Sequence, residues 1–194
     1  MPSPRFSTLL LLAALAFTTV RAGEKPPGFP DLQQDADGYW AVGFQHLASF
    51  SFGRHKVPDP DTALLNHGAR LALLVPDDSD QVELPTEPGQ SGTIPDNVRA
   101  LDGRRVRIAG YMLPVKVENG LVKECLLLRN QMMCCYGRRP ELNEWVVVRF
   151  AGDGVPARMD TPLAFYGTLH VGERFEDHVF TGLYELAADK ISAP

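Results

Sequence analysis

The chain lacks the short motifs that identify many enzymes and cofactor-binding proteins. Its 194 residues contain no GxSxG nucleophile elbow, no HExxH zinc motif, no glycine-rich phosphate loop and no CxxCH haem-attachment site. A cysteine hydrolase built on Cys134 or Cys135 with His170 would need a general base and an orienting group, and the sequence identifies neither. These absences favour a non-catalytic protein.

Long apolar runs are also scarce, and the one that stands out lies at the N-terminus. Arg5 precedes the run Leu9–Phe17, and Val20-Arg21-Ala22 follows it with the small residues that signal peptidase requires. The run is shorter than the roughly 20 residues that span a bilayer, which favours a cleaved signal peptide over an uncleaved anchor. We therefore expect a signal peptide over residues 1–22, no lipid anchor, no later transmembrane segment, and a periplasmic or secreted protein.

Positive charge is too scarce overall to suggest nucleic acid as a partner. Loss of Arg5 and Arg21 with the signal leaves 17 of the 19 basic residues against 24 acidic ones, a net charge of −7. The stretch from Arg99 to Arg158 is nevertheless basic, with 11 Lys or Arg against 6 Asp or Glu. Its charge indicates either two oppositely charged surfaces that attract each other or an anion-binding face.

The first half of the mature chain is irregular. Residues 23–37 contain three prolines and predict a flexible lead-in. From Tyr39 to Phe52, apolar and polar residues alternate, which predicts a half-buried strand bent near Gln45-His46. Residues 53–95 predict a loop-rich insertion. Three histidines are expected at the surface rather than in a site: His46, His55 and His67.

The second half predicts strands separated by turns. At least five are expected, over residues 104–115, 123–129, 144–150, 163–171 and 179–186. Gly110, Gly167 and Gly182 lie inside them, as glycines do where a small barrel bends. We expect a single mostly β domain over residues 38–192. It is predicted to be a small OB-like β-barrel with an N-terminal extension and one long insertion; a β-sandwich is the alternative.

The most specific chemical feature is a cluster of sulfur side chains in one loop. Met132, Met133, Cys134 and Cys135 form a soft donor set suited to Cu(I), or to Zn(II) with a histidine such as His170. Two alternatives remain open for this loop. The side chains can simply pack as apolar groups, or the vicinal cysteines can carry thiol–disulfide chemistry, because a bridge across about 3.8 Å is strained.

Three stretches of the second half resemble a known family. They are Ile94-Pro95-Asp96-Asn97-Val98 with Leu101–Pro114, the central run Leu126–Gly137 followed by Pro140 and Asn143–Val148, and Gly167–Glu173. Over residues 94–190 the chain resembles the bacterial exported domain-of-unknown-function family 3299. The resemblance implies an exported bacterial protein with an OB-like barrel and supplies no activity. Cys125 stands where an ordinary apolar strand residue is expected, which supports a core role.

Three functions follow as hypotheses. The first is a periplasmic accessory protein that binds zinc or copper through Cys134 and Cys135, with His170, Met132 or Met133 completing the site. The second is an OB-like interaction module for an anionic partner or another protein, which it would contact through arginines: Arg105, Arg107, Arg138 and Arg139. The third is a thiol–disulfide redox protein.

Overall fold

The computed structural model describes the chain at residues 24–52, 54–55, 82–83, 85, 89, 92–131 and 141–194. The predicted signal peptide and the sulfur cluster Met132–Cys135 lie outside these residues, as does most of the predicted insertion. Within the described part, no helix is long and apolar enough to cross a membrane.

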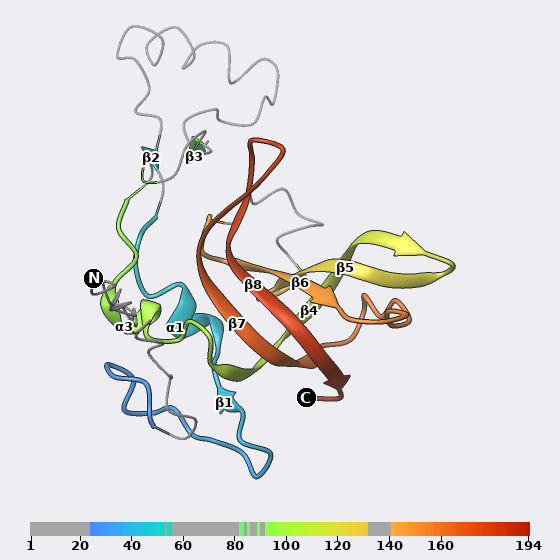
Figure 1. The fold of residues 1–194 in the computed structure, drawn as a ribbon, viewed down its shortest axis with the longest axis horizontal. Coiled ribbons are helices and arrows are strands. Elements are labelled where there is room, and N and C mark those ends of the chain that lie inside the picture. Colours follow the sequence, from blue (N-terminus) through green and yellow to red (C-terminus); the bar gives the residue numbers. More distant parts are fainter. Residues whose placement is uncertain are drawn as a thin grey trace, which may run out of the picture.

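Five strands form a closed β-barrel (Figure 1). They are β4 (Arg105–Glu118), β5 (Leu121–Leu128), β6 (Trp145–Phe150), β7 (Leu163–Glu176) and β8 (Val179–Ser192). Their order is β4-β5-β6-β8-β7, and β7 pairs with β4 to close the ring. Neighbours are antiparallel except β6 and β8, which are parallel. This arrangement confirms the prediction of a mostly β, OB-like barrel.

The alternating pattern of β4 explains how it forms one wall of the barrel. Val106, Ile108 and Met112 are at most 2% exposed, and Gly110 is also buried. The residues that alternate with these four are half-buried or exposed. The strand ends at Asn119-Gly120, whose positive φ angles of 51° and 79° suit a two-residue hairpin turn into β5. The strand and turn therefore follow the pattern expected from the sequence.

Two strand glycines lie where the barrel strands come very close. A Cβ atom at Gly167 would stand 2.1 Å from the carbonyl oxygen of Ala187, and one at Gly110 would stand 2.5 Å from that of Leu128. No side chain fits at these distances. Glycine is therefore required at both positions by the curvature of the sheet.

The segment from Tyr39 to Phe52 is a very short strand followed by a helical turn. β1 (Trp40–Ala41) pairs in parallel with Val106 and Arg107, and α1 (Phe44–Leu47) follows directly. The prediction of one bent strand across this segment is wrong beyond Ala41. The reason is a local cap, since the N–H of Gly43 donates to Nδ1 of His46 at 2.9 Å and closes the first turn of α1.

His46 is buried, so the prediction of a surface position is wrong. Its side chain packs edge-on against Phe29, with ring centroids 5.1 Å apart. Because Nδ1 accepts a hydrogen bond, Nε2 is the nitrogen that carries hydrogen, and it donates to the Asp31 carboxylate at 2.8 Å. That hydrogen bond lowers the pKa of Asp31. His46 thus joins the lead-in to α1.

The predicted flexible lead-in packs against the barrel. Phe29 and Leu32 are 6% and 2% exposed and belong to the main core. Gln34 forms a bridge with Trp40, and Lys190 of β8 holds the Asp37 carboxylate at 2.7 Å. The lead-in is therefore held on the barrel by two buried apolar side chains and by an ion pair with β8.

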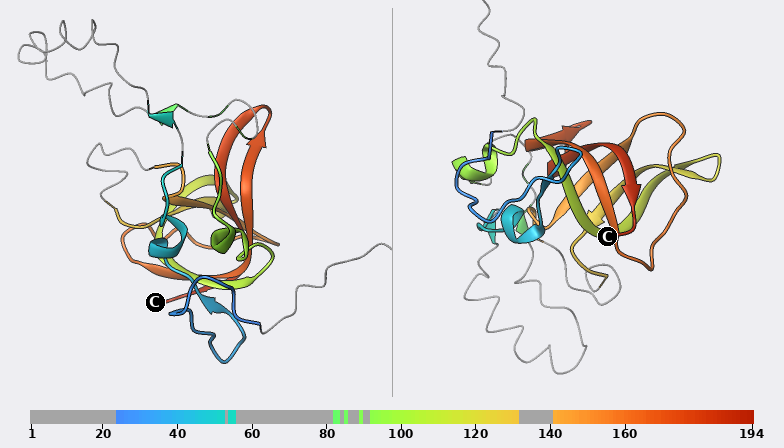
Figure 2. Two further views of the ribbon diagram at one scale, coloured as in Figure 1. Left: turned by 90° about the vertical axis from the view of Figure 1, so that its left-hand side faces the viewer. Right: turned by 90° about the horizontal axis from the view of Figure 1, so that it is seen from below.

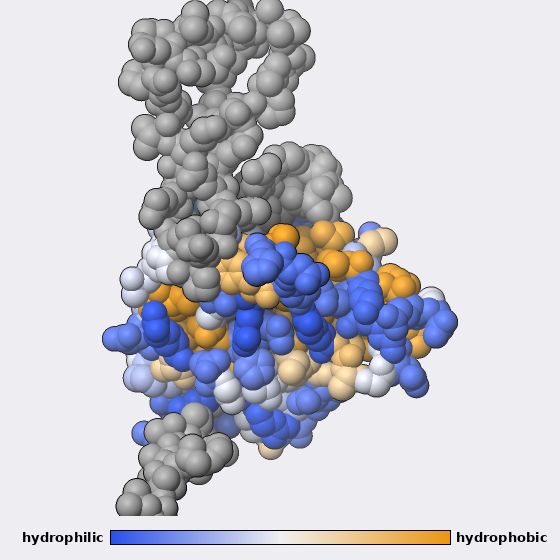
Figure 3. Space-filling model, turned by 45° about the horizontal axis from the view of Figure 1, so that its top comes forward, coloured by the Kyte–Doolittle hydropathy of each residue, from blue (hydrophilic) through white to orange (hydrophobic). Residues whose placement is uncertain are grey.

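One end of the barrel carries the two short helices (Figure 2). α3 (Asp96–Arg99) lies where a helical turn is predicted, with an acid in its first turn and a base in its last, as the helix dipole favours. Two short strands lie within the predicted insertion, β2 (Arg54–His55) and β3 (Val82–Glu83), and they pair antiparallel. Hydrophilic residues cover most of the described surface in Figure 3, with hydrophobic residues between them.

Candidate functional site

Of the predicted metal ligands, only His170 lies among the described residues. Met132, Met133, Cys134 and Cys135 lie outside the described residues. His170 lies on β7 with its side chain 39% exposed, and its Nδ1 is 4.0 Å from the Asp102 carboxylate. Among the residues that the structure describes, no group of three or more His, Cys, Asp or Glu could hold a metal ion. Metal binding at this loop therefore stays a prediction.

Cys125 is a core residue, as predicted. It is fully buried in β5, and this burial, with a smaller contribution from Glu124, raises the pKa of its thiol to about 12. The thiol is therefore protonated at neutral pH and a poor nucleophile. Cys125 is therefore not a candidate for thiol–disulfide chemistry, which stays a prediction for Cys134 and Cys135.

Of the arginines predicted to bind an anionic partner, Arg105 is occupied by contacts within the protein. Its guanidinium lies 4.1 Å from the centroid of the Tyr39 ring and donates to the carbonyl of Asp37 at 3.3 Å. It therefore holds the lead-in against β4. Arg138 and Arg139 lie outside the described residues.

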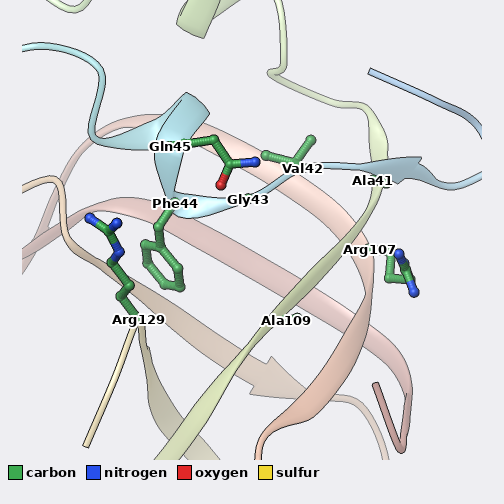
Figure 4. Close-up of a pocket in the computed structure, with 8 residues that line it drawn as sticks. All are labelled: Ala41, Val42, Gly43, Phe44, Gln45, Arg107, Ala109 and Arg129. Atoms are coloured by element: carbon green, nitrogen blue, oxygen red, sulfur yellow. The ribbon is translucent and has the colours of Figure 1, made fainter. Parts of the chain in front are cut away.

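Arg107 instead lines a surface cavity of about 360 Å³ (Figure 4), here called the arginine hollow. Its walls come from the β1–α1 segment, from β4 and from the residue that follows β5. The lining residues are Ala41, Val42, Gly43, Phe44, Gln45, Arg107, Ala109 and Arg129.

The hollow exists because the sheet is interrupted along one edge of β4. β1 reaches only Ala41, which pairs with Arg107, and β5 begins to pair with β4 at Tyr111. Between these points β7 pairs with one edge of β4 as far as Gly110. The opposite edge beside Ala109 has no neighbouring described strand, and the cavity lies there.

The lining of the hollow is positively charged. Arg107 is half-buried and Arg129 is exposed, and no acidic residue is among the eight that line the cavity. Neither guanidinium has an ion-pair partner within the described part of the chain. Each offers planar N–H donors suited to carboxylate or phosphate oxygens. The arrangement can therefore bind an anion.

A contrasting arginine lies on the outer surface of the barrel. Arg149 of β6 faces three carboxylates, with Glu124 and Glu185 at 3.5 and 3.6 Å and Glu176 in direct contact. The second and third strands of an OB barrel, here β5 and β6, commonly bind oligonucleotides or sugars. In this chain the surface around Arg149 has an excess of negative charge, which disfavours a nucleic-acid ligand there.

A second cavity, of about 400 Å³, is lined by Ser49, Ser51 and the turn Glu141–Glu144, among others. Two of its polar side chains are engaged with the backbone. The buried Asn143 amide donates to the carbonyl of Phe50, and the Glu144 carboxylate accepts the N–H of Glu141 at 3.0 Å. Glu144 therefore caps this turn. These hydrogen bonds stabilise the turn that leads into β6.

Comparison with known proteins decides the family. The model of the family described as a protein of unknown function, DUF3299, matches residues 78–193. The chain belongs to the DUF3299 family. A solved structure of a DUF3299 family protein from Pseudomonas aeruginosa PAO1 is similar to it, with 22% identity and a TM-score of 0.49. The similarity covers 78% of this chain and 93% of that chain. None of the curated proteins matches the chain.

The arginine hollow lies across the boundary of the DUF3299 match. Arg107, Ala109 and Arg129 fall within residues 78–193, whereas the wall formed by Ala41–Gln45 precedes them. The site therefore combines the DUF3299 barrel with the N-terminal segment of this chain.

Sequence reasoning missed Arg129 and Gln45 as residues of this site. The spacing of Gly43 and His46, the N-cap and N3 positions, allows the His46 side chain to cap the turn that carries Gln45. Arg129 directly precedes the loop of the sulfur cluster. Nothing in its surroundings in the sequence indicates that β1 stops short and leaves this side chain beside a cavity.

Proposed function

We propose that this protein is an exported, non-catalytic binding module that holds an anionic ligand in the arginine hollow. One observation carries the proposal. Arg107 and Arg129, from separate parts of the barrel, line one cavity of about 360 Å³ whose described lining includes no carboxylate. The closely paired Arg149 shows the alternative, an arginine neutralised within the fold.

The chemistry of the lining supports binding. Hydrogen bonds from a charged donor contribute roughly 1.5–3 kcal/mol each, about twice the contribution of neutral ones. The buried side chains Val42 and Phe44 form an apolar wall, and the exposed Gln45 adds an amide. The described lining therefore combines two cationic donors with an apolar surface, as small-molecule sites commonly do.

The test is anion binding by purified protein that begins after the predicted signal peptide. Titration with sulfate and with acetate at low ionic strength, followed by NMR shifts, should show weak saturable binding to the wild type. The double variant Arg107→Gln/Arg129→Gln should lose it. Arg158→Gln is the matched control, because Arg158 is an exposed arginine outside the hollow. Equal binding by the wild type and the double variant would exclude the proposal.

The sulfur cluster supports a second candidate function, binding of zinc or copper. Two thiols and two thioethers in one loop are a soft donor set, and the buried Cys125 does not compete with them for a metal. The measurement is the metal content of untagged protein from the periplasm, compared with Cys134→Ser/Cys135→Ser. Near-stoichiometric metal in the wild type alone would support it. Equal, negligible metal in both would rule it out.

A further inference from the structure

We infer that the arginine hollow binds an elongated dianion, a molecule with an anionic group at each end of an uncharged stem. This inference rests on the proposed function and adds the shape and charge of the ligand. It follows from where the two guanidinium groups lie and from what lies between them.

The two arginines enter the hollow from positions well separated along β4. Leu128 pairs with Tyr111, so the antiparallel register brings Arg129 beside Gly110, three residues beyond Arg107. At about 3.3 Å per residue the two backbone positions are roughly 10 Å apart along the strand. A single carboxylate is too small to bridge that separation unless both side chains turn toward each other.

The side chains do not turn toward each other. Figure 4 shows the two guanidinium groups at opposite ends of the hollow, with Phe44 and Ala109 between them. The middle of the lining is therefore uncharged. A volume of about 360 Å³ also exceeds what one small anion fills, since a water molecule occupies roughly 30 Å³.

Gln45 supplies a polar group beside the uncharged middle of the hollow, where the stem of the ligand would lie. Its Oε1 lies close over Gly43, because a Cβ atom at Gly43 would stand 2.2 Å from it. The amide is therefore folded back over the backbone of Gly43, one of the uncharged residues of the lining. A stem with apolar and polar portions suits this lining better than a purely hydrocarbon one.

A series of linear dicarboxylates tests the inference directly. Malonate, glutarate, pimelate and sebacate are titrated against the wild type, with hexanoate as the monocarboxylate control. Affinity should rise with stem length to an optimum beyond malonate and exceed that of hexanoate by about tenfold, the gain from one further charged hydrogen-bonding group. In Arg107→Gln and in Arg129→Gln, taken singly, that advantage and the length optimum should both disappear.

The outcomes separate this inference from the proposed function. If all dicarboxylates and hexanoate bind the wild type equally well, or if malonate binds best, the hollow is a single-anion site. The inference then fails and the proposed function stands. If no anion binds, both fail. Urea unfolding of each variant, with Arg158→Gln beside them, verifies that a lost interaction does not come from a lost fold.

Discussion

The barrel and the N-terminal segment of residues 24–52 are held by different kinds of contact. The barrel is a ring of five hydrogen-bonded strands around fully buried side chains such as Ile108 and Leu186. The segment contributes a two-residue strand and a four-residue helix, and its other contacts with the barrel are made mainly by side chains. Strands paired around a closed ring unfold cooperatively, whereas a segment held by a few side-chain contacts can detach locally.

This difference matters because the arginine hollow lies where the two regions meet. The barrel supplies both guanidinium groups, and the segment supplies the opposite wall with Val42, Phe44 and Gln45. Local opening of the segment would therefore remove one wall of the cavity, while the barrel would keep both guanidinium groups. Three predictions test how independent the two regions are.

The largest effect is expected at Gly167 in the barrel. In Gly167→Val the new Cβ would stand 2.1 Å from the carbonyl oxygen of Ala187 and 2.9 Å from Cα of Ala188, and backbone atoms of a closed ring cannot move aside cheaply. The free energy of unfolding should fall by about 3 kcal/mol or more. Urea unfolding measures it. Ala187→Val is the control, an exposed position on the neighbouring strand that should change stability by under about 0.5 kcal/mol.

A smaller and more local effect is expected where the segment is anchored to the barrel. The buried Tyr184 hydroxyl donates to the carbonyl of Leu47 at 2.7 Å, and burial raises the pKa of Tyr184 well above its usual range, which keeps it a neutral donor. Tyr184→Phe leaves that carbonyl unpaired and should cost about 1–2 kcal/mol. Limited proteolysis should then cut within residues 24–52 before it cuts the barrel.

The control for this anchor is Tyr166→Phe, since among the described residues the Tyr166 hydroxyl makes only a long 3.5 Å contact, with Ser192. It should behave like the wild type. Cleavage of Tyr184→Phe within β4–β8 at the same rate as within the segment would show that the two regions open together.

The barrel could be predicted from the sequence because its signals are local. The alternation along Arg105–Met112, the Asn119-Gly120 turn and the position of Gly167 each report directly on a strand, a hairpin or a close approach. The DUF3299 resemblance includes the Arg105–Met112 stretch and Gly167. Local pattern and final structure agree there because most pairings join strands that are adjacent in sequence.

The segment and the site could not be predicted in the same way. Trp40, Val42 and Phe44 alternate as a strand would, and all three are buried, yet the chain turns into α1 after Gly43. Two features decide this: the local hydrogen bond from Gly43 to His46, and the barrel end that buries Phe44. The alternation of apolar residues reports neither. Arg129 has the sequence context of an ordinary strand residue, and it becomes a site residue only because β1 ends at Ala41.

The smallest effect is expected in the pH dependence of the segment. The hydrogen bond from His46 lowers the pKa of Asp31, and the hydrogen bond from Lys190 lowers the pKa of Asp37. A carboxyl whose folded pKa lies below its unfolded value of about 3.9 stabilises the protein above that value, and this contribution is lost as the pH falls through the folded pKa. The free energy of unfolding of Asp31→Asn/Asp37→Asn should therefore fall less than that of the wild type between about pH 5 and pH 2.

Urea unfolding across this pH range measures how steeply the free energy of unfolding falls. Asp160→Asn, at an exposed loop position, is the control and should retain the wild-type slope. Identical slopes for the wild type and the double variant would show that the two carboxylates do not help to hold the segment on the barrel.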